Sequence, residues 1–239
     1  ARMAAAAADC GVQIRDIRKP PDRSALHFFS GKIDEVGALR VAVLGTDSAV
    51  GKRTTAWELV DALEASGVPA ALAGTGQTAW LQGADASIVL DSLVNDFVSG
   101  EIEHLVWTIW EQRRPRVIVL EGQGSLMNPA YPGGFELLAA GRPHAVVLQH
   151  APARADYDGF PGNPIHPLPD QIRAIELISG RPVVAITVNH EGMDPAEVPS
   201  ACARIREETG LPAHDVLLEG AAPLMAALEP WFREAGVAA

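Results

Sequence analysis

Cysteine is scarce in this sequence, which has only Cys10 and Cys202 among its 239 residues. The two lie far apart and form neither a metal-ligand nor a redox spacing, so we predict no disulfide scaffold and no metal site. A reduced compartment, the cytoplasm, is the expected location. The chain also has no internal repeats.

Positive charge and long apolar runs are scarce as well. Nineteen Lys and Arg face 30 Asp and Glu, a net charge of -11, which argues against nucleic acid or an anionic membrane as a partner. Apolar runs such as 117–120 and 145–148 are far shorter than the roughly 20 residues that span a bilayer. The alanine-rich start does not resemble a secretory signal, and because it opens at Ala1 rather than Met we expect a fragment or a processed product.

The sequence alternates between short runs of Val, Ile and Leu and stretches of helical period, the pattern of parallel strands joined by crossover helices. It therefore predicts an α/β fold, a three-layer parallel sheet. The predicted strands are 40–45, 69–74, 116–121, 144–149, 182–189 and a possible last one at 216–218. The predicted helices are 54–66, 91–113 with a break near Gly100, 169–178, 195–209 and 221–235.

Two irregular stretches interrupt this pattern. Pro20 and Pro21 indicate a linker, so we place a boundary near residue 39, with residues 1–39 as an N-terminal remnant and 40–239 as the α/β domain. The proline-rich stretch 151–169 is long for a connection and is either a functional loop or a tolerated insertion.

A phosphate-binding loop follows the first predicted strand. A buried strand leads into a glycine-bounded loop and then a helix, so backbone N–H groups and the helix N-terminus can converge on phosphate oxygens while Lys52 reaches the terminal phosphates. The candidate phosphate-binding residues are Gly45, Thr46, Asp47, Ser48, Ala49, Val50, Gly51, Lys52, Arg53, Thr54 and Thr55.

This loop departs from the usual P-loop in two ways. Five residues rather than four separate Gly45 from Gly51, and Arg53 stands where a Ser or Thr that binds Mg²⁺ normally follows the lysine. The Gly-Thr-Asp opening and this spacing resemble dethiobiotin synthetase and related ligases. A loop with an extra cation could hold a diphosphate without cleaving it.

Polar residues follow every predicted strand, at the edge where open parallel sheets bind ligands. Glu121 follows four apolar residues and is a candidate catalytic carboxylate, and His150 is a candidate general base. Asp96 lies on a predicted helix with Glu101 and Glu103, and is either catalytic or part of a solvated face. Asn189 is a candidate for contact with a purine base, and the candidate substrate-binding residues are Thr75, Gln77, Thr78, Gln123 and Ser125.

Four ordered motifs carry a resemblance to a known family, namely the loop 45–55 and the segments 74–78, 95–100 and 121–126. Together they resemble a P-loop family, formerly of unknown function, whose characterised members are D-glutamate (D-amino-acid) N-acetyltransferases that use acetyl-CoA. The resemblance implies a P-loop nucleoside triphosphate hydrolase-like topology, preceded by a Rossmann-like domain of which residues 11–21 would be the last piece. Members often have His where this sequence has Asn128.

The resemblance implies acetyl transfer from acetyl-CoA to the amine of an acidic D-amino acid, with Glu121 or His150 as the base. Two alternatives stay open: an ATP- and Mg²⁺-dependent ligase or kinase in which Asp47, Glu121 and Thr54 or Thr55 bind the metal, and a nucleotide-binding module without turnover. The expected partner is a small-molecule amino-acid substrate, and a missing N-terminal domain and homo-oligomers are both possible.

Overall fold

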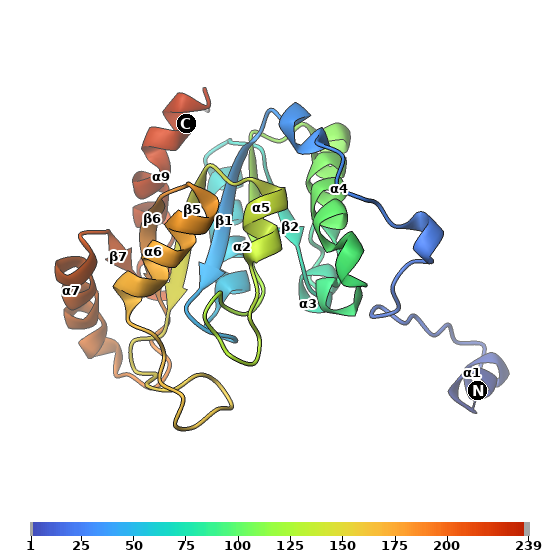
Figure 1. The fold of residues 1–239 in the computed structure, drawn as a ribbon, viewed down its shortest axis with the longest axis horizontal. Helices are drawn as coiled ribbons and strands as arrows, with labels where there is room; N and C mark the ends of the chain where they lie inside the picture. Colours follow the sequence, from blue (N-terminus) through green and yellow to red (C-terminus); the bar gives the residue numbers. More distant parts are fainter. Residues whose placement is uncertain (1, 237–239) are drawn as a thin grey trace.

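The structure is a computed structural model that describes residues 2–236. Its centre is a parallel sheet in the order β3-β2-β4-β1-β5-β6-β7 (Figure 1). This arrangement confirms the predicted α/β fold with a parallel sheet. The strands are β1 (Leu39–Gly45), β2 (Ala70–Gly74), β3 (Ala86–Ser87), β4 (Val117–Glu121), β5 (Ala145–His150), β6 (Val183–Val188) and β7 (Ala213–His214).

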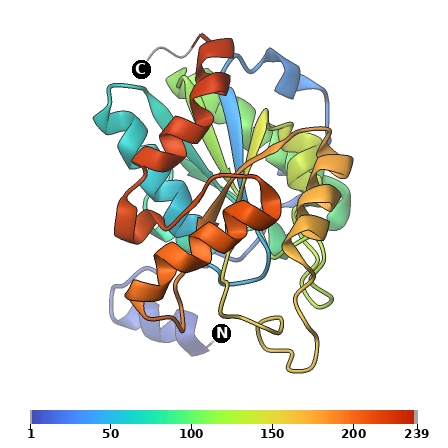
Figure 2. The same cartoon turned by 90° about the vertical axis from the view of Figure 1, so that its left-hand side faces the viewer.

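Helices cover both faces of the sheet, which is why the central strands are apolar along their whole length. Figure 2 shows α2 and α9 on one side and α6 on the other. Leu59 and Leu228 belong to one apolar cluster, and Ile102 and Leu137 belong to the second, on the opposite face. The helices are α1 (Arg2–Asp9), α2 (Lys52–Ala65), α3 (Gln77–Leu81), α4 (Asn95–Arg113), α5 (Phe135–Gly141), α6 (Leu168–Ser179), α7 (Val198–Thr209), α8 (Val216–Glu219) and α9 (Ala222–Glu234). Among the described residues, no helix is both long and apolar enough to cross a membrane.

Two details of the predicted secondary structure are wrong. The expected strand at 216–218 is the short helix α8, because the Asp215 side chain accepts hydrogen bonds from the Leu217 and Leu218 backbone N–H groups and caps it. The neighbouring strand β7 comes earlier, at Ala213–His214. The expected break near Gly100 is also absent, since α4 runs unbroken from Asn95 to Arg113.

Gly100 has a packing role instead. A Cβ atom there would lie 2.1 Å from the His27 carbonyl oxygen, so the missing side chain lets the N-terminal segment cross α4 closely. Glu101 and Glu103 hold that segment: Glu101 Oε1 accepts a hydrogen bond from the His27 N–H (2.7 Å), and Glu103 Oε2 accepts one from the Ser30 N–H (2.6 Å). Both carboxylates are buried, so they are not part of a solvated face.

The N-terminal end of the chain extends away from the sheet (Figure 1), whereas Arg15 and Arg18 contact α3 and Asp91. Figure 1 shows α1 well separated from the other helices. Two short 3₁₀ helices, Arg23–Ala25 and Lys32–Glu35, connect it to β1. The boundary near residue 39 stays a prediction, although residues 27–33 already pack on α4.

Candidate functional site

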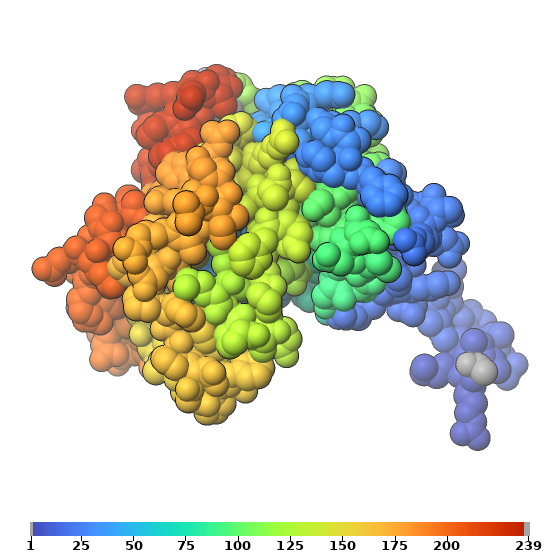
Figure 3. All heavy atoms as spheres, in the orientation of Figure 1, coloured from blue at the N-terminus to red at the C-terminus, as the bar shows by residue number. Residues whose placement is uncertain are grey.

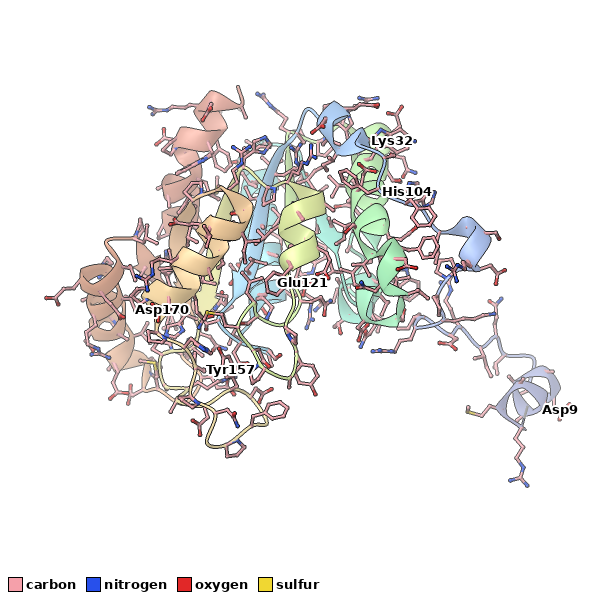
Figure 4. The ribbon with its side chains drawn as sticks, in the orientation of Figure 1. Asp9, Lys32, His104, Glu121, Tyr157 and Asp170 are labelled. Atoms are coloured by element: carbon pink, nitrogen blue, oxygen red, sulfur yellow. The ribbon has the colours of Figure 1, made fainter. Side chains whose placement is uncertain are left out.

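The candidate site lies at the carboxyl ends of the strands, where the loops after β1, β4 and β5 meet. Figure 4 shows Glu121 at this end of the sheet, with Tyr157 in the loop that follows β5. In Figure 3 the yellow-green loop after β4 and the gold proline-rich loop lie next to each other on the surface. Polar side chains from several strands therefore converge at one edge, as in other open parallel sheets.

The P-loop joins β1 to α2 through a strained, tightly wound backbone. Gly51 has φ of 100° and Ala49 has φ of 52°, both in the left-handed region. A Cβ on Gly45 would lie 2.8 Å from Val50 Cγ2, so the loop folds directly back over the end of the strand. It borders a cavity of about 430 Å³, lined by Ser48, Ala49, Val50, Gly51, Lys52, Arg53, Thr54, Gly76, Gln77, Thr78, Asp91, Glu121, Gly122, Gln123 and Gly124.

Lys52 points its ammonium group across the loop. Its Nζ donates hydrogen bonds to the carbonyl oxygens of Asp47 (2.7 Å) and Gly124 (2.9 Å). Burial lowers the pKa of Lys52 to about 8, against the opposing effect of Glu121 and Asp47. Lys52 is therefore a positive charge near neutral pH that is only partly compensated, next to the cavity.

Arg53 and Glu121 face each other on the cavity wall. Arg53 Nη1 lies 4.0 Å from Glu121 Oε1, and the Glu121 side chain is 9% exposed. Within residues 2–236, Glu121 Oε2 has no hydrogen-bond partner. Burial raises the pKa of Glu121 above its usual value, while Arg53 and Lys52 oppose the rise. Glu121 is thus a buried carboxyl group whose Oε2 has no hydrogen-bond partner in the described part of the chain, a combination typical of functional sites.

The Asp47 side chain fixes the shape of the P-loop through four hydrogen bonds. The side chain is fully buried, and Oδ1 accepts hydrogen bonds from the Ser48 N–H (2.7 Å) and Asn128 Nδ2 (2.8 Å). Oδ2 accepts from Arg154 Nη1 and from the Asp158 N–H, both at 2.8 Å. Asp47 therefore ties the P-loop to the loop after β4 and to the proline-rich loop. The proline-rich loop is therefore in direct contact with the P-loop, through Arg154 and Asp158.

A second cavity of about 620 Å³ adjoins the first. Ser48, Asp91, Gln123 and Gly124 line both, so the two cavities are neighbours that share one wall. The remaining lining residues of the second cavity are mainly apolar or glycine, with Tyr131, Asn95 and Glu136 as its other polar side chains. The site therefore offers a polar compartment at the P-loop and a less polar one beside it.

Several predicted site residues line the P-loop cavity and others serve the fold. Thr54, Gln77, Thr78 and Gln123 line it, together with the loop from Ser48 to Arg53 and Glu121. Thr75, Thr55 and Ser125 are buried in the surrounding structure. Thr75 Oγ1 donates to the Glu121 carbonyl oxygen (2.8 Å), Thr55 Oγ1 donates to Gln149, and Ser125 Oγ donates to Gln171 (3.5 Å).

Three candidates lie apart from the cavity. Asp96 is 66% exposed and lies 3.9 Å from Arg23, away from Glu121 and the P-loop. His150 Nδ1 is 3.0 Å from Thr46 Oγ1, and burial lowers the His150 pKa to about 4, so the ring is neutral at physiological pH. Asn189 Nδ2 donates to the Val50 carbonyl oxygen (3.1 Å), so its amide holds the loop.

Sequence reasoning missed three residues of the site. Arg154 binds Asp47 and the Ser48 carbonyl oxygen, and Asn128 donates to Asp47. Asp91 lines both cavities. The Arg154 and Asn128 contacts join positions more than 80 residues apart, and no local pattern announces them. Asn128 was noted only as a departure from the family pattern. Within the described chain, no group of three or more His, Cys, Asp or Glu residues could hold a metal ion.

A buried parallel strand, a glycine-bounded loop and a lysine at the start of the next helix define a P-loop protein. The chain belongs to the family described as "Domain of unknown function (DUF1611_C) P-loop domain", whose model matches residues 27–225. A solved structure of a DUF1611 family protein from Anabaena variabilis is 32% identical, with a TM-score of 0.85 over 93% of this chain and 66% of that one.

Two curated relatives are both named D-glutamate N-acetyltransferase. The protein from Tritonibacter scottomollicae is 30% identical over 95% of this chain and 67% of its own length, and the one from a Pseudoalteromonas species is 30% identical over 89% and 64%. The chain thus spans about two thirds of the length of these relatives. A nucleotide-binding protein in complex with ADP from Archaeoglobus fulgidus, 12% identical, shares the fold with a TM-score of 0.50 over 77% of this chain and 84% of that one.

Proposed function

We propose that this chain is the P-loop part of an N-acetyltransferase that moves the acetyl group of acetyl-CoA to the amine of an acidic D-amino acid such as D-glutamate. The kinship to two proteins named D-glutamate N-acetyltransferase supports the reaction. The Arg53–Glu121 pair on the cavity wall is the observation that supports CoA phosphates as the ligand of the P-loop.

Arg53 changes what the loop can bind. In an ATP-cleaving P-loop the residue after the lysine gives a hydroxyl to Mg²⁺, which neutralises the phosphates. Here a guanidinium takes that position and, with Lys52, brings two positive charges to the cavity. The diphosphate of CoA would lie against the N–H groups of the loop and these two cations, with no metal required.

The contacts of the candidate metal ligands also disfavour the ligase or kinase alternative. Both side-chain oxygens of Asp47 already accept two hydrogen bonds each, and the Thr55 hydroxyl donates to Gln149. Of the proposed metal ligands, Thr54 and Glu121 line the cavity, and Glu121 faces Arg53. A metal would have to displace this guanidinium or share the carboxylate with it.

Glu121 is the best-placed base. The Glu121 carboxylate, which lines the P-loop cavity, would take a proton from the substrate ammonium and so make the amine nucleophilic. Its raised pKa brings the carboxylate closer to the pH at which base catalysis is efficient. The amine then forms the C–N bond as the C–S bond of the thioester breaks, and CoA leaves as the thiol with a proton. The backbone N–H groups of Gln123 and Gly124 would stabilise the oxyanion, since that of Gly122 already donates to the Val43 carbonyl oxygen (2.9 Å).

Isothermal titration of the chain with acetyl-CoA and with ATP, each with and without Mg²⁺, tests the phosphate site. We expect acetyl-CoA to bind without metal, and Arg53→Thr to weaken this binding about tenfold or more, the loss of one charge-assisted contact. The matched control is Arg173→Thr, which removes an exposed arginine on α6 and should leave binding unchanged. Binding of Mg-ATP alone would support the ligase alternative.

An acetyl-transfer assay that detects free CoA thiol tests the base. With D-glutamate as acceptor, Glu121→Gln should lower the rate by about 10²-fold or more, whereas His150→Ala should change it far less. Equal rates in the wild type and in the Glu121 variant would refute the assignment.

A further inference from the structure

The N-terminal segment 15–21 lies against the candidate site. Arg15 stacks on the Trp80 ring of α3, with its guanidinium carbon 5.1 Å from the ring centre. Arg18 Nη2 donates to Asp91 Oδ2 (2.8 Å), and Arg18 Nη1 donates to Gln77 Oε1 (3.3 Å). The same segment forms one wall of a third cavity of about 430 Å³, with α4 and Trp80 opposite. In Figure 1 this part of the chain reaches the lower end of α4 before it turns back.

Arg18 itself lines neither cavity of the site, but its guanidinium is held by two residues that do. Gln77 lines the P-loop cavity, and Asp91 lines both the P-loop cavity and the second cavity. In the proposed function the CoA phosphates occupy the P-loop cavity, which leaves the neighbouring second cavity for the acyl acceptor. An acceptor bound beside Asp91 would have Arg18 within reach of one of its carboxylates.

The charges of the second cavity pose a problem for an acidic acceptor. Asp91 and Glu136 line it, and among its described lining residues there is neither a lysine nor an arginine. The two cations of the P-loop, Lys52 and Arg53, line the other cavity, where the proposed function assigns them to the CoA phosphates. A carboxylate that enters this cavity would meet only like charge unless another residue compensates it.

We propose that Arg18 binds a carboxylate of the acidic acceptor and is a specificity-determining residue of the site; this inference rests on the proposed function. The Arg18–Asp91 pair is half exposed, 50% and 52%, so it is weak and can be exchanged. A planar guanidinium binds a carboxylate through two parallel hydrogen bonds, which a lysine cannot do. Asp91 holds the guanidinium in place until the acceptor takes it over.

The test compares D-glutamate with two analogues: 4-aminobutyrate, which lacks the α-carboxylate, and D-glutamine, which lacks the side-chain carboxylate. Binding of each is measured by titration calorimetry on the chain loaded with an acetyl-CoA analogue in which a methylene group replaces the thioester sulfur, so that no transfer occurs. Arg18→Gln should weaken D-glutamate binding about 10- to 100-fold, the loss of a charge-assisted pair. The substitution should weaken by a similar factor the binding of the analogue that keeps the carboxylate bound by Arg18. It should leave unchanged the binding of the analogue that lacks this carboxylate.

Two matched variants separate this role from a general loss of charge or fold. Arg15→Gln removes the same charge from the same segment but contacts Trp80, so it should leave acceptor binding unchanged. Arg18→Lys keeps the positive charge but cannot form two parallel hydrogen bonds, so it should retain only part of the affinity for D-glutamate. Equal weakening of all three acceptors, no weakening of any, or absence of D-glutamate binding by the wild-type chain would overturn the proposal. D-glutamate binding that depends on Arg18 without any acetyl transfer would refute the proposed function and leave the role of Arg18 standing.

Discussion

Replacement of Asp47 by asparagine should both destabilise the chain and distort the P-loop. The fully buried carboxylate accepts four hydrogen bonds, from Ser48, Asn128, Arg154 and Asp158. In Asp47→Asn one carboxylate oxygen becomes an NH₂ group, which donates rather than accepts. The two donors that contact this oxygen in the wild type would therefore lose their acceptor. Arg154, 16% exposed, would also lose its buried counter-ion and keep only Glu191.

Loss of one partner of a buried ion pair costs about 3–5 kcal/mol, and the partial exposure of Arg154 places this case near 3 kcal/mol. For a chain of this size that corresponds to a fall in Tm of about 6–12 °C. Urea denaturation and thermal unfolding, followed by circular dichroism, measure both quantities. The control is Glu191→Gln, which removes the other, 62% exposed partner of Arg154 and should cost less than about 1 kcal/mol. A cost below 1 kcal/mol for Asp47→Asn would refute the idea that this side chain holds the loops together.

Three further outcomes are expected. Lys52→Met should remove a pH dependence of stability. In the folded wild type the pKa of Lys52 is lowered to about 8 from 10.5, so the cost of burying the ammonium is present below pH 8 and is relieved between about pH 8 and 10.5. The wild-type free energy of unfolding should therefore rise over this range, and urea titrations of the variant should not show the rise. The acetyl-transfer rate should fall on the acid side at a pH above that usual for a glutamic acid, because burial raises the pKa of Glu121, and pH–rate profiles of Glu121→Gln should lose this limb. Gly100→Ala should cost about 1–3 kcal/mol despite its helical position, since the new Cβ would lie 2.1 Å from the His27 carbonyl oxygen, whereas Glu111→Ala on the same helix should stay within about 0.5 kcal/mol in the same unfolding assay.

The central strands and the P-loop could be predicted from the sequence because their signals are local. A buried parallel strand is apolar along its length, and the loop carries its glycines and lysine at fixed spacing. The edge strands β3 and β7 are two residues long and leave no such signal. At 216–218 an apolar run resembles a strand, but the cap from Asp215 determines a helix.

The organisation of the site depended on contacts that no local pattern encodes. Glu121 was predicted from its place at a strand end, and it lines the P-loop cavity. Asp96 was placed by its motif, yet it lies on the exposed side of α4. The roles of Arg18 and Arg154 depend on partners 73 and 107 positions away, which only the folded chain brings together. The catalytic roles themselves stay predictions for the assays above.

The hydrogen bonds of Asp47 also bear on the order in which the chain folds. They join it to Asn128, Arg154 and Asp158, which are 81, 107 and 111 positions away. Contacts between such distant positions carry a high loop-closure cost and form slowly, whereas helices and neighbouring strand–helix pairs form early. The pairing of β1 with β4 and β5 joins similarly distant positions, such as Leu39 with Val117 and Val41 with Ala145. We therefore expect the P-loop to acquire its final shape together with the sheet and after the helices, so that in a refolding experiment the recovery of ligand binding should lag behind the recovery of helical circular dichroism.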